Sequence, residues 1–223
     1  MQKELRTQIN NLELSIKNAS ADASRKSDIT TIAVSKKKTI EHIKCAYDLG
    51  IRNFGENYAQ ELEEKARQLK LDKIIWHFLG PLQSNKTKII SNYAHWVHSL
   101  DREKIVNKIN NECENLNKKI NGCIQVNISE EASKSGIKPR ELLDFADHLK
   151  SLENINLRGI MVLPSLSGDA EEQMIESKKL HNKLIESYPN AKFLSMGTTN
   201  DFESAIKFGS NMIRVGELIF GKR

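Results

Sequence analysis

The chain of 223 residues is poor in the residue types that mark membrane-spanning, disulfide-rich or zinc-stapled proteins. Its three cysteines, Cys45, Cys113 and Cys123, form no CxxC pair and are too few for a disulfide framework or a four-cysteine zinc site. No stretch approaches the uninterrupted run of about eighteen apolar residues that a membrane-spanning helix needs, and the N-terminus is too polar for a signal peptide. We therefore expect reduced thiols, no metal, no membrane partner and a cytoplasmic location.

Aromatic residues are also scarce, at 6% of the chain, which is low for a protein that stacks on nucleic-acid bases. The net charge of +5 comes from 34 basic and 29 acidic residues that are interspersed throughout. This mixture indicates a well-solvated surface and argues against nucleic acid as a partner. Because no low-complexity tract or Pro/Gly-rich linker interrupts the sequence, we expect a single domain over residues 1–223.

Short apolar or β-branched runs alternate with amphipathic stretches along the chain, after an amphipathic N-terminal segment at about 2–18. The segment 39–50 is typical of a helix, with Thr39 at the N-cap and Gly50 at the C-terminal end. A second helical pattern, 139–152, opens with Pro139 in its first turn. The predicted strands are 30–36, 53–57, 74–80, 96–100, 120–129, 157–164, 193–197 and 212–220.

Eight strands alternating with helices predict an α/β fold with a parallel sheet and helices outside it. A closed (β/α)8 barrel of the TIM type fits best. No helix is expected after the eighth strand, so the N-terminal helix would complete the outer ring. An open doubly wound sheet is the alternative, although no strand is followed by the GxGxxG turn that favours it.

In both architectures ligands bind at the carboxyl ends of the strands, and Lys36 ends the first of them. Strand alternation puts Ile32, Val34 and Lys36 on one face. If that face is inward, Lys36 points into the barrel mouth, where partial desolvation favours a neutral amine able to form a Schiff base. The plain alternative is a solvated lysine at a strand end.

Residues 195–201, after the seventh strand, bring small and hydroxyl residues to the start of a helix, as in a phosphate site. The alternative is an ordinary helix start capped by Asn200 or Asp201. On the eighth strand, an inward Arg214 needs a partner, which is either a ligand or a structural ion pair. Gly216 lets a ligand approach the backbone closely.

Polar residues also follow the second and third strands, where Asn57 and His77 lie. A single histidine such as His77 is more often a satisfied core residue than a catalytic base, and no HxxxH pair suggests a metal site. A Schiff-base lysine, a phosphate cradle and an arginine together suit a phosphorylated aldehyde. Pyridoxal 5′-phosphate is the leading candidate, and a sugar phosphate handled by a Schiff-base aldolase is the second.

Several segments extend this interpretation: AVSK at 33–36, FGENY at 54–58, WHFLGPLQSNK at 76–86, SKSGI at 133–137, LRGIMVLP at 157–164, LSMG at 194–197 and IRVGELIFG at 213–221. With these segments, in this order, the sequence resembles the pyridoxal phosphate homeostasis protein family over essentially its whole length. The resemblance implies a barrel like the N-terminal domain of alanine racemase, with pyridoxal phosphate held as a Schiff base on Lys36.

The resemblance also implies roles for individual residues. Arg214 would approach the cofactor ring and leave its nitrogen unprotonated, which weakens the ring as an electron sink. Asn57 would lie near the ring hydroxyl. The phosphate would be cradled by Ser195, Gly197 and the hydroxyl residue that follows, Thr198, with the backbone of Gly216. The expected cofactor-binding residues are Lys36, Asn57, His77, Ser195, Gly197, Thr198, Arg214 and Gly216.

Two positions depart from the family pattern. The chain reads SMGTT where SMGMS is usual, although Thr198 and Thr199 still offer hydroxyl and N–H groups. Glu217 replaces a residue that is more often small and hydroxylated. Because a carboxylate facing a phosphate is repulsive, we expect the Glu217 side chain to turn outward.

Family members are described as binding and distributing pyridoxal phosphate, a form of vitamin B6, and as influencing amino-acid and keto-acid pools without established turnover. By this resemblance we expect a monomeric carrier or regulator with no catalytic residues, and with pyridoxal-phosphate-dependent apo-enzymes as recipients. A two-base racemase of this fold takes its second acid/base from an additional C-terminal β-domain, which this chain is not expected to have. A pyridoxal-phosphate-dependent amino-acid racemase and a Schiff-base aldolase remain the alternatives.

Overall fold

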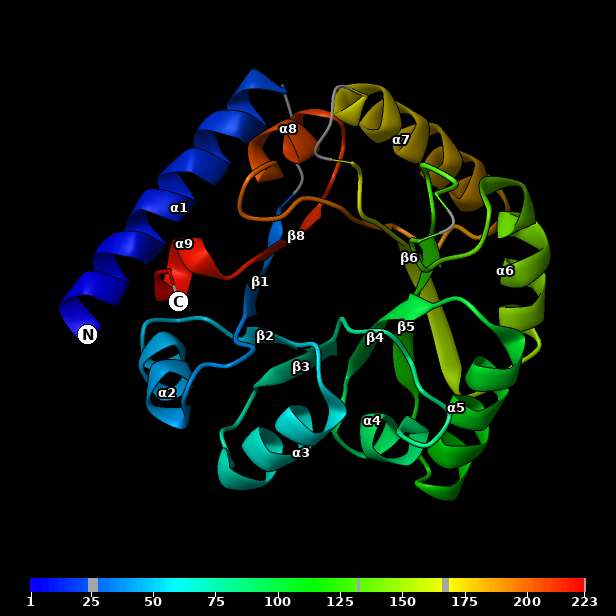
Figure 1. Cartoon of the computed structure of the whole chain (residues 1–223), viewed down its shortest axis with the longest axis horizontal. Coiled ribbons are helices and arrows are strands. Elements are labelled where there is room, and N and C mark those ends of the chain that lie inside the picture. The colour runs from blue at the N-terminus through cyan, green and yellow to red at the C-terminus, as the bar shows by residue number, and fades with distance from the viewer. Residues whose placement is uncertain (24–27, 132, 166–168, 223) are drawn as a thin grey trace.

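The computed structural model, which describes residues 1–23, 28–131, 133–165 and 169–222, is a barrel of eight parallel strands. The strands follow one another in chain order around the ring, and β8 pairs with β1 to close it (Figure 1). The predicted (β/α)8 barrel is therefore confirmed, and the open sheet is excluded. The strands are β1 Thr30–Val34, β2 Asn53–Glu56, β3 Ile75–Phe78, β4 Trp96–Leu100, β5 Ile120–Val126, β6 Ile155–Val162, β7 Phe193–Ser195 and β8 Met212–Val215.

The helices form a ring outside the strands (Figure 1). The N-terminal helix α1 packs against α8 and α9, so it occupies the part of the outer ring predicted for it. A short 3₁₀ turn, Pro139–Glu141, precedes α6, so Pro139 does open that helical region. The helices are α1 Gln2–Asp22, α2 Ile40–Asp48, α3 Ala59–Gln68, α4 Thr87–Tyr93, α5 Glu103–Asn115, α6 Leu142–Lys150, α7 Ala170–Ser187, α8 Phe202–Lys207 and α9 Glu217–Phe220.

The prediction of one strand over 212–220, with no helix after it, is wrong. Strand β8 ends at Val215, and residues Glu217–Phe220 form the short helix α9. A short apolar run does not reveal its period, so the sequence did not separate a buried strand from a buried helical turn here. Ile219 and Phe220 are buried in the core that also contains residues of α1, so α9 is held by packing.

The barrel has two apolar layers. The larger layer lies between sheet and helices, and the smaller one fills the barrel interior with Ile32, Trp96, Cys123, Met161 and Met212. Since Ile32 belongs to the interior and its neighbour Ala33 to the outer layer, the predicted alternation along β1 is confirmed. The inward face of β1 then leads to the barrel mouth.

All three cysteines are free thiols and buried. Burial raises the pKa of Cys123 to about 12, so this thiol is not ionised at neutral pH. No helix within the described part of the chain is long and apolar enough to cross a membrane.

Candidate functional site

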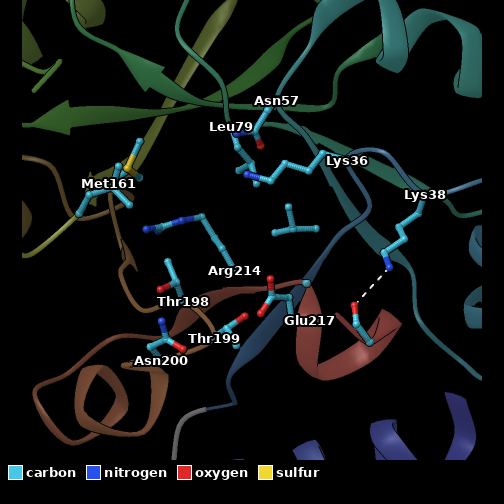
Figure 2. A pocket seen from close by; sticks show the side chains of 14 residues that line it. Lys36, Lys38, Asn57, Leu79, Met161, Thr198, Thr199, Asn200, Arg214 and Glu217 are labelled. Atoms are coloured by element: carbon cyan, nitrogen blue, oxygen red, sulfur yellow. Dashed lines mark hydrogen bonds between the residues drawn. The ribbon is translucent and has the colours of Figure 1, made fainter. Parts of the chain in front are cut away.

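A cavity of about 390 Å³ opens at the carboxyl ends of β1, β2, β3, β6, β7 and β8 (Figure 2). Its volume lies within the range of roughly 300–1,000 Å³ that is usual for small-molecule sites. The lining residues come from strand ends and the loops that follow them: Val34, Lys36, Lys38, Asn57, Leu79, Met161, Leu163, Thr198, Thr199, Asn200, Arg214, Gly216, Glu217 and Gly221. Predicted residues from four separate segments thus reach a single cavity.

Lys36 lies in the turn that follows β1, half-buried, and its side chain extends into the cavity (Figure 2). Two residues of α3, Glu61 and Lys65, form hydrogen bonds that hold this turn. Lys37 adopts a left-handed backbone conformation with φ of 61°, and its N–H donates to Oε1 of Glu61 at 2.5 Å. Lys65 Nζ donates to the backbone oxygen of Ser35 at 2.7 Å. The position of the Lys36 backbone is therefore fixed on both sides of the residue.

Beneath this turn lies a buried cluster that the sequence analysis missed. Glu56 is fully buried, and its Oε1 accepts hydrogen bonds from Ser35 Oγ at 2.6 Å and Lys65 Nζ at 2.8 Å. Burial raises the pKa of Glu56 to about 7, although the Lys65 ammonium opposes part of that rise. The spacing of Glu61 and Lys65 on one helix was the available signal, and such a pair normally indicates a solvated helix face.

Arg214 lies on β8 opposite Ile32 of β1 and is 6% exposed. Its two terminal nitrogens donate to Ser195 Oγ at 2.7 Å and to the backbone oxygen of Val162 at 3.0 Å. Burial lowers the pKa of Arg214 to about 10, so the guanidinium is still cationic at neutral pH. Within the described part of the chain no carboxylate forms an ion pair with it, so the structural ion pair considered above is excluded there.

The loop after β7 is organised by Asp201, the N-cap residue of α8. Thr198 donates both its N–H and its hydroxyl to Oδ1 of Asp201, at 2.6 and 2.8 Å. The donors of Thr198 are therefore committed, whereas the N–H groups of Thr199 and Asn200 have no acceptor among the described residues. Gly197 has φ of 98°, and a Cβ there would lie 2.7 Å from Cβ of Ala205, so this glycine is needed for packing against α8.

The prediction that Glu217 turns outward is wrong. Glu217 is exposed to solvent, yet it lines the cavity, and its carboxylate lies on the side of Thr199 (Figure 2). The physical reason is its place as the first residue of α9, since helical side chains lean toward the N-terminus and the cavity lies ahead of this helix. At Gly216 a Cβ would lie 3.0 Å from the backbone oxygen of Val34, so the chain passes close to β1 there.

The expected site residues thus fall into two groups. Lys36, Asn57, Thr198, Arg214 and Gly216 line the cavity. The others lie behind it: Gly197 in the packing of α8, Ser195 beneath Arg214, and His77 in the barrel interior.

His77 is a satisfied core histidine, as its plain interpretation predicted. Its ring nitrogens lie 3.0 Å from Asn53 Oδ1 and 2.9 Å from His98 Nε2. Burial lowers the pKa of His77 to about 3, so the ring is neutral at physiological pH. No group of three or more metal-ligating side chains occurs in the described ranges.

Comparison with known proteins agrees with this geometry. The alanine racemase N-terminal domain family matches residues 10–223. The pyridoxal phosphate homeostasis protein of Pasteurella multocida is 42% identical over 220 residues, which are 95% of this chain and 94% of the relative.

Solved structures show the same barrel. PipY of Synechococcus elongatus with pyridoxal phosphate bound has a TM-score of 0.80 and 29% identity, covering 92% of this chain and all of PipY. The alanine racemase of Clostridium difficile shares the fold, with a TM-score of 0.77 and 17% identity over 98% of this chain and 56% of the racemase. The sequence and the barrel fold of this chain together establish that it belongs to the pyridoxal phosphate homeostasis protein family, which carries the alanine racemase N-terminal domain.

Proposed function

We propose that this chain binds pyridoxal phosphate in the cavity at the barrel mouth and buffers or supplies it to other proteins. The observation that carries the proposal is Arg214, a buried cation that faces the cavity with no carboxylate at ion-pair distance among the described residues, the charge of Asp201 acting on it only from farther away. A buried charge without a counter-charge is costly, and an anionic ligand in the cavity offsets that cost. The names of the relatives and the ligand of PipY support the choice of pyridoxal phosphate.

Lys36 is the residue proposed to hold the ligand covalently. Its Nζ, once deprotonated, would condense with the ligand's aldehyde, replacing the C=O bond by a C=N bond and releasing one water molecule. The turn that carries Lys36 is fixed by Glu61 and Lys65, which reduces the conformational freedom lost on binding. Asn57 lines the same cavity and is proposed to face the ring hydroxyl.

The phosphate is proposed to lie against the start of α8 and the backbone at Gly216. The uncommitted N–H groups of Thr199 and Asn200 are suited to donate hydrogen bonds to the phosphate oxygens, while Thr198 shapes the loop through Asp201. Ser195 and Gly197 support this end of the cavity from behind. Glu217 opposes phosphate binding by charge, which suits a protein that must release its ligand.

The proposed role is that of a carrier or regulator with no catalytic residues. Bound pyridoxal phosphate supplies a reactive aldehyde and a ring that withdraws electrons when its nitrogen is protonated. Arg214 can only donate hydrogen bonds, so a ring nitrogen facing it must act as acceptor and stay unprotonated. This arrangement favours holding the ligand over processing an amino acid.

The test is the absorption spectrum of the protein incubated with pyridoxal phosphate, recorded before and after borohydride. We expect a Schiff-base band that borohydride abolishes in the wild type and that is lost in Lys36→Ala. The exposed neighbour provides the matched control, because Lys37→Ala retains the backbone N–H bound to Glu61. A normal band in Lys36→Ala contradicts the assignment, and no band in the wild type favours a sugar phosphate as ligand.

A second measurement tests the carrier role. The protein loaded with pyridoxal phosphate is incubated with each amino acid, and the products are analysed for racemisation or deamination. We expect no steady turnover, and transfer of the ligand to an added apo-enzyme. Continuous formation of racemised product would establish the racemase alternative instead.

A further inference from the structure

A line of polar side chains crosses the barrel interior, from Arg214 at the cavity to Asn53, the first residue of β2. Arg214 Nη1 lies 2.7 Å from Ser195 Oγ, which lies 2.9 Å from His98 Nδ1. His98 Nε2 lies 2.9 Å from His77 Nδ1, and His77 Nε2 lies 3.0 Å from Asn53 Oδ1. We call these five residues the interior chain. Ser195, His77 and His98 are 0% exposed.

The chemistry of its members gives the interior chain a direction. Arginine only donates, so Ser195 Oγ accepts from Arg214 and is left with one proton to donate. His98 Nδ1 accepts that proton, which leaves Nε2 as the protonated nitrogen of a neutral ring. His98 then donates to His77 Nδ1, and His77 donates from Nε2 to Asn53 Oδ1. Each of the four contacts in the line then joins one donor to one acceptor.

The opposite direction leaves a group unsatisfied. In this direction the Asn53 amide is turned round and donates to His77. His77 then donates to His98, and His98 donates to Ser195. Ser195 Oγ would then accept from both His98 and Arg214, and its own proton would have no acceptor within the described ranges. A buried hydroxyl proton without an acceptor is unfavourable, so the first direction is preferred.

The surroundings keep both histidines neutral. His77 stacks on Trp96, with ring centroids 5.6 Å apart, and the guanidinium of Arg158 lies 5.9 Å from the same indole. The charged and titratable groups that act on the two rings are Arg214 in the interior and His95, which directly precedes β4, while Arg158 lies over the neighbouring indole. Burial is the main cause that opposes protonation of either histidine; His95 adds to it at His77, and His77 and the Arg214 cation add to it at His98.

We propose that Asn53, His77, His98 and Ser195 are positioning residues that hold the Arg214 guanidinium at the cavity through this one-directional interior chain. Asn53, His77 and His98 do not line the cavity, so they act only through Ser195 and Arg214. Arg214 is thereby presented to a ligand as a fixed donor. The proposal deepens the proposed function, and its consequence for pyridoxal phosphate rests on that function.

The first test is nitrogen NMR of the histidine rings in the full-length protein, without added ligand, between pH 6 and 8. We expect both His77 and His98 to be neutral throughout, with the proton on Nε2. A proton on Nδ1 of either ring, or a cationic ring, would overturn the interior chain. This measurement needs no substitution, so it stands even if a variant does not fold.

The second test breaks the far end of the chain with Asn53→Leu and preserves it with Asn53→Asp. We expect Asn53→Leu to broaden the Arg214 guanidinium resonance and to weaken pyridoxal phosphate binding about fivefold. Asn53→Asp, which retains an acceptor for His77, restores the narrow resonance. His181→Gln is the control, because His181 is a buried histidine whose ring bonds only the backbone oxygen of Ala191 among the described residues.

The outcomes separate the two proposals. An unchanged Arg214 resonance in Asn53→Leu, or the same broadening in His181→Gln, would overturn the positioning role. A wild-type protein that shows the expected tautomers but binds no pyridoxal phosphate would contradict the proposed function and leave the interior chain intact.

Discussion

Lys65 Nζ lies 2.7 Å from the backbone oxygen of Ser35, so a lysine of α3 holds the residue that precedes Lys36. The same ammonium group pairs with Glu56 and Glu61 at 2.8 and 2.6 Å. A nearly buried cation thus connects β1, β2 and α3 at one point. The backbone geometry at Lys36, the lysine proposed to form the Schiff base, therefore depends on this ion-pair cluster as well as on the barrel.

Removal of the Lys65 charge should therefore affect both stability and ligand binding. Lys65→Met keeps much of the side-chain volume but leaves Glu56 buried with no cation beside it. We expect a loss of about 3 kcal/mol in the free energy of unfolding, measured in urea. The double variant Lys65→Met/Glu56→Gln should recover part of this loss. Equal losses in the single and double variants would show that the ion pair is not the cause.

Glu56 also predicts a pH dependence. Its pKa is raised to about 7 in the folded protein from an unfolded value of about 4.5, so the folded state binds the proton more tightly. Its contribution to stability is fully present below pH 4.5 and is lost as the pH rises through 7. The loss is on the order of 3 kcal/mol. Glu56→Gln, compared with the wild type by urea unfolding at pH 5 and 8, should show a weaker fall in stability. A parallel fall in both proteins would contradict this assignment.

Glu217 should weaken the binding of a phosphorylated ligand. Its carboxylate lines the cavity beside the proposed phosphate position, and Glu217→Gln removes the charge with little change in shape. We expect the dissociation constant for pyridoxal phosphate, measured by fluorescence titration, to fall about fivefold, with the difference shrinking at high salt. Glu203→Gln, a change of equal charge on α8 outside this cavity, is the control. Weaker binding by Glu217→Gln would show that the carboxylate helps to hold the ligand.

Gly80 should tolerate no side chain. A Cβ on Gly80 would lie 1.9 Å from the backbone oxygen of Asn57, so the loop after β3 passes against the loop that carries Asn57. We expect Gly80→Ala to lower the free energy of unfolding by about 2 kcal/mol and to weaken pyridoxal phosphate binding. Gly50→Ala is the control for backbone strain alone, because Gly50 has φ of 102° and a Cβ there would have no neighbouring atom within 4 Å. Gly80→Ala adds steric overlap instead. Normal ligand binding by Gly80→Ala would show that Asn57 is not displaced.

Much of the fold was predictable because it rests on periodicity. Eight apolar runs separated by helical stretches have few parallel arrangements, and strand alternation put Ile32, Val34 and Lys36 on one face. Only the structure shows that this face is the inward one. The end of β8 was not predictable, because Leu218, Ile219 and Phe220 are consecutive apolar residues that suit a buried strand and a buried helical turn equally.

Residues that line the cavity were predictable where each lies at the end of a single strand, as Lys36 and Arg214 do. Contacts between side chains from two different elements were not predictable. His77 and His98 lie 21 residues apart and meet only because β3 and β4 pair in a particular register. Lys65 and Glu61 have the spacing of a solvated helix pair, and only the closed barrel buries Lys65 against Glu56.

The proposed function depends most on covalent attachment of pyridoxal phosphate to Lys36. The most direct measurement incubates the protein with one equivalent of the ligand, reduces it with borohydride and locates the modified lysine by fragmentation mass spectrometry. We expect a single pyridoxyl group on Lys36, absent from the Lys36→Ala protein. A pyridoxyl group on Lys38, or modification spread over exposed lysines with Lys36 unmodified, would contradict it.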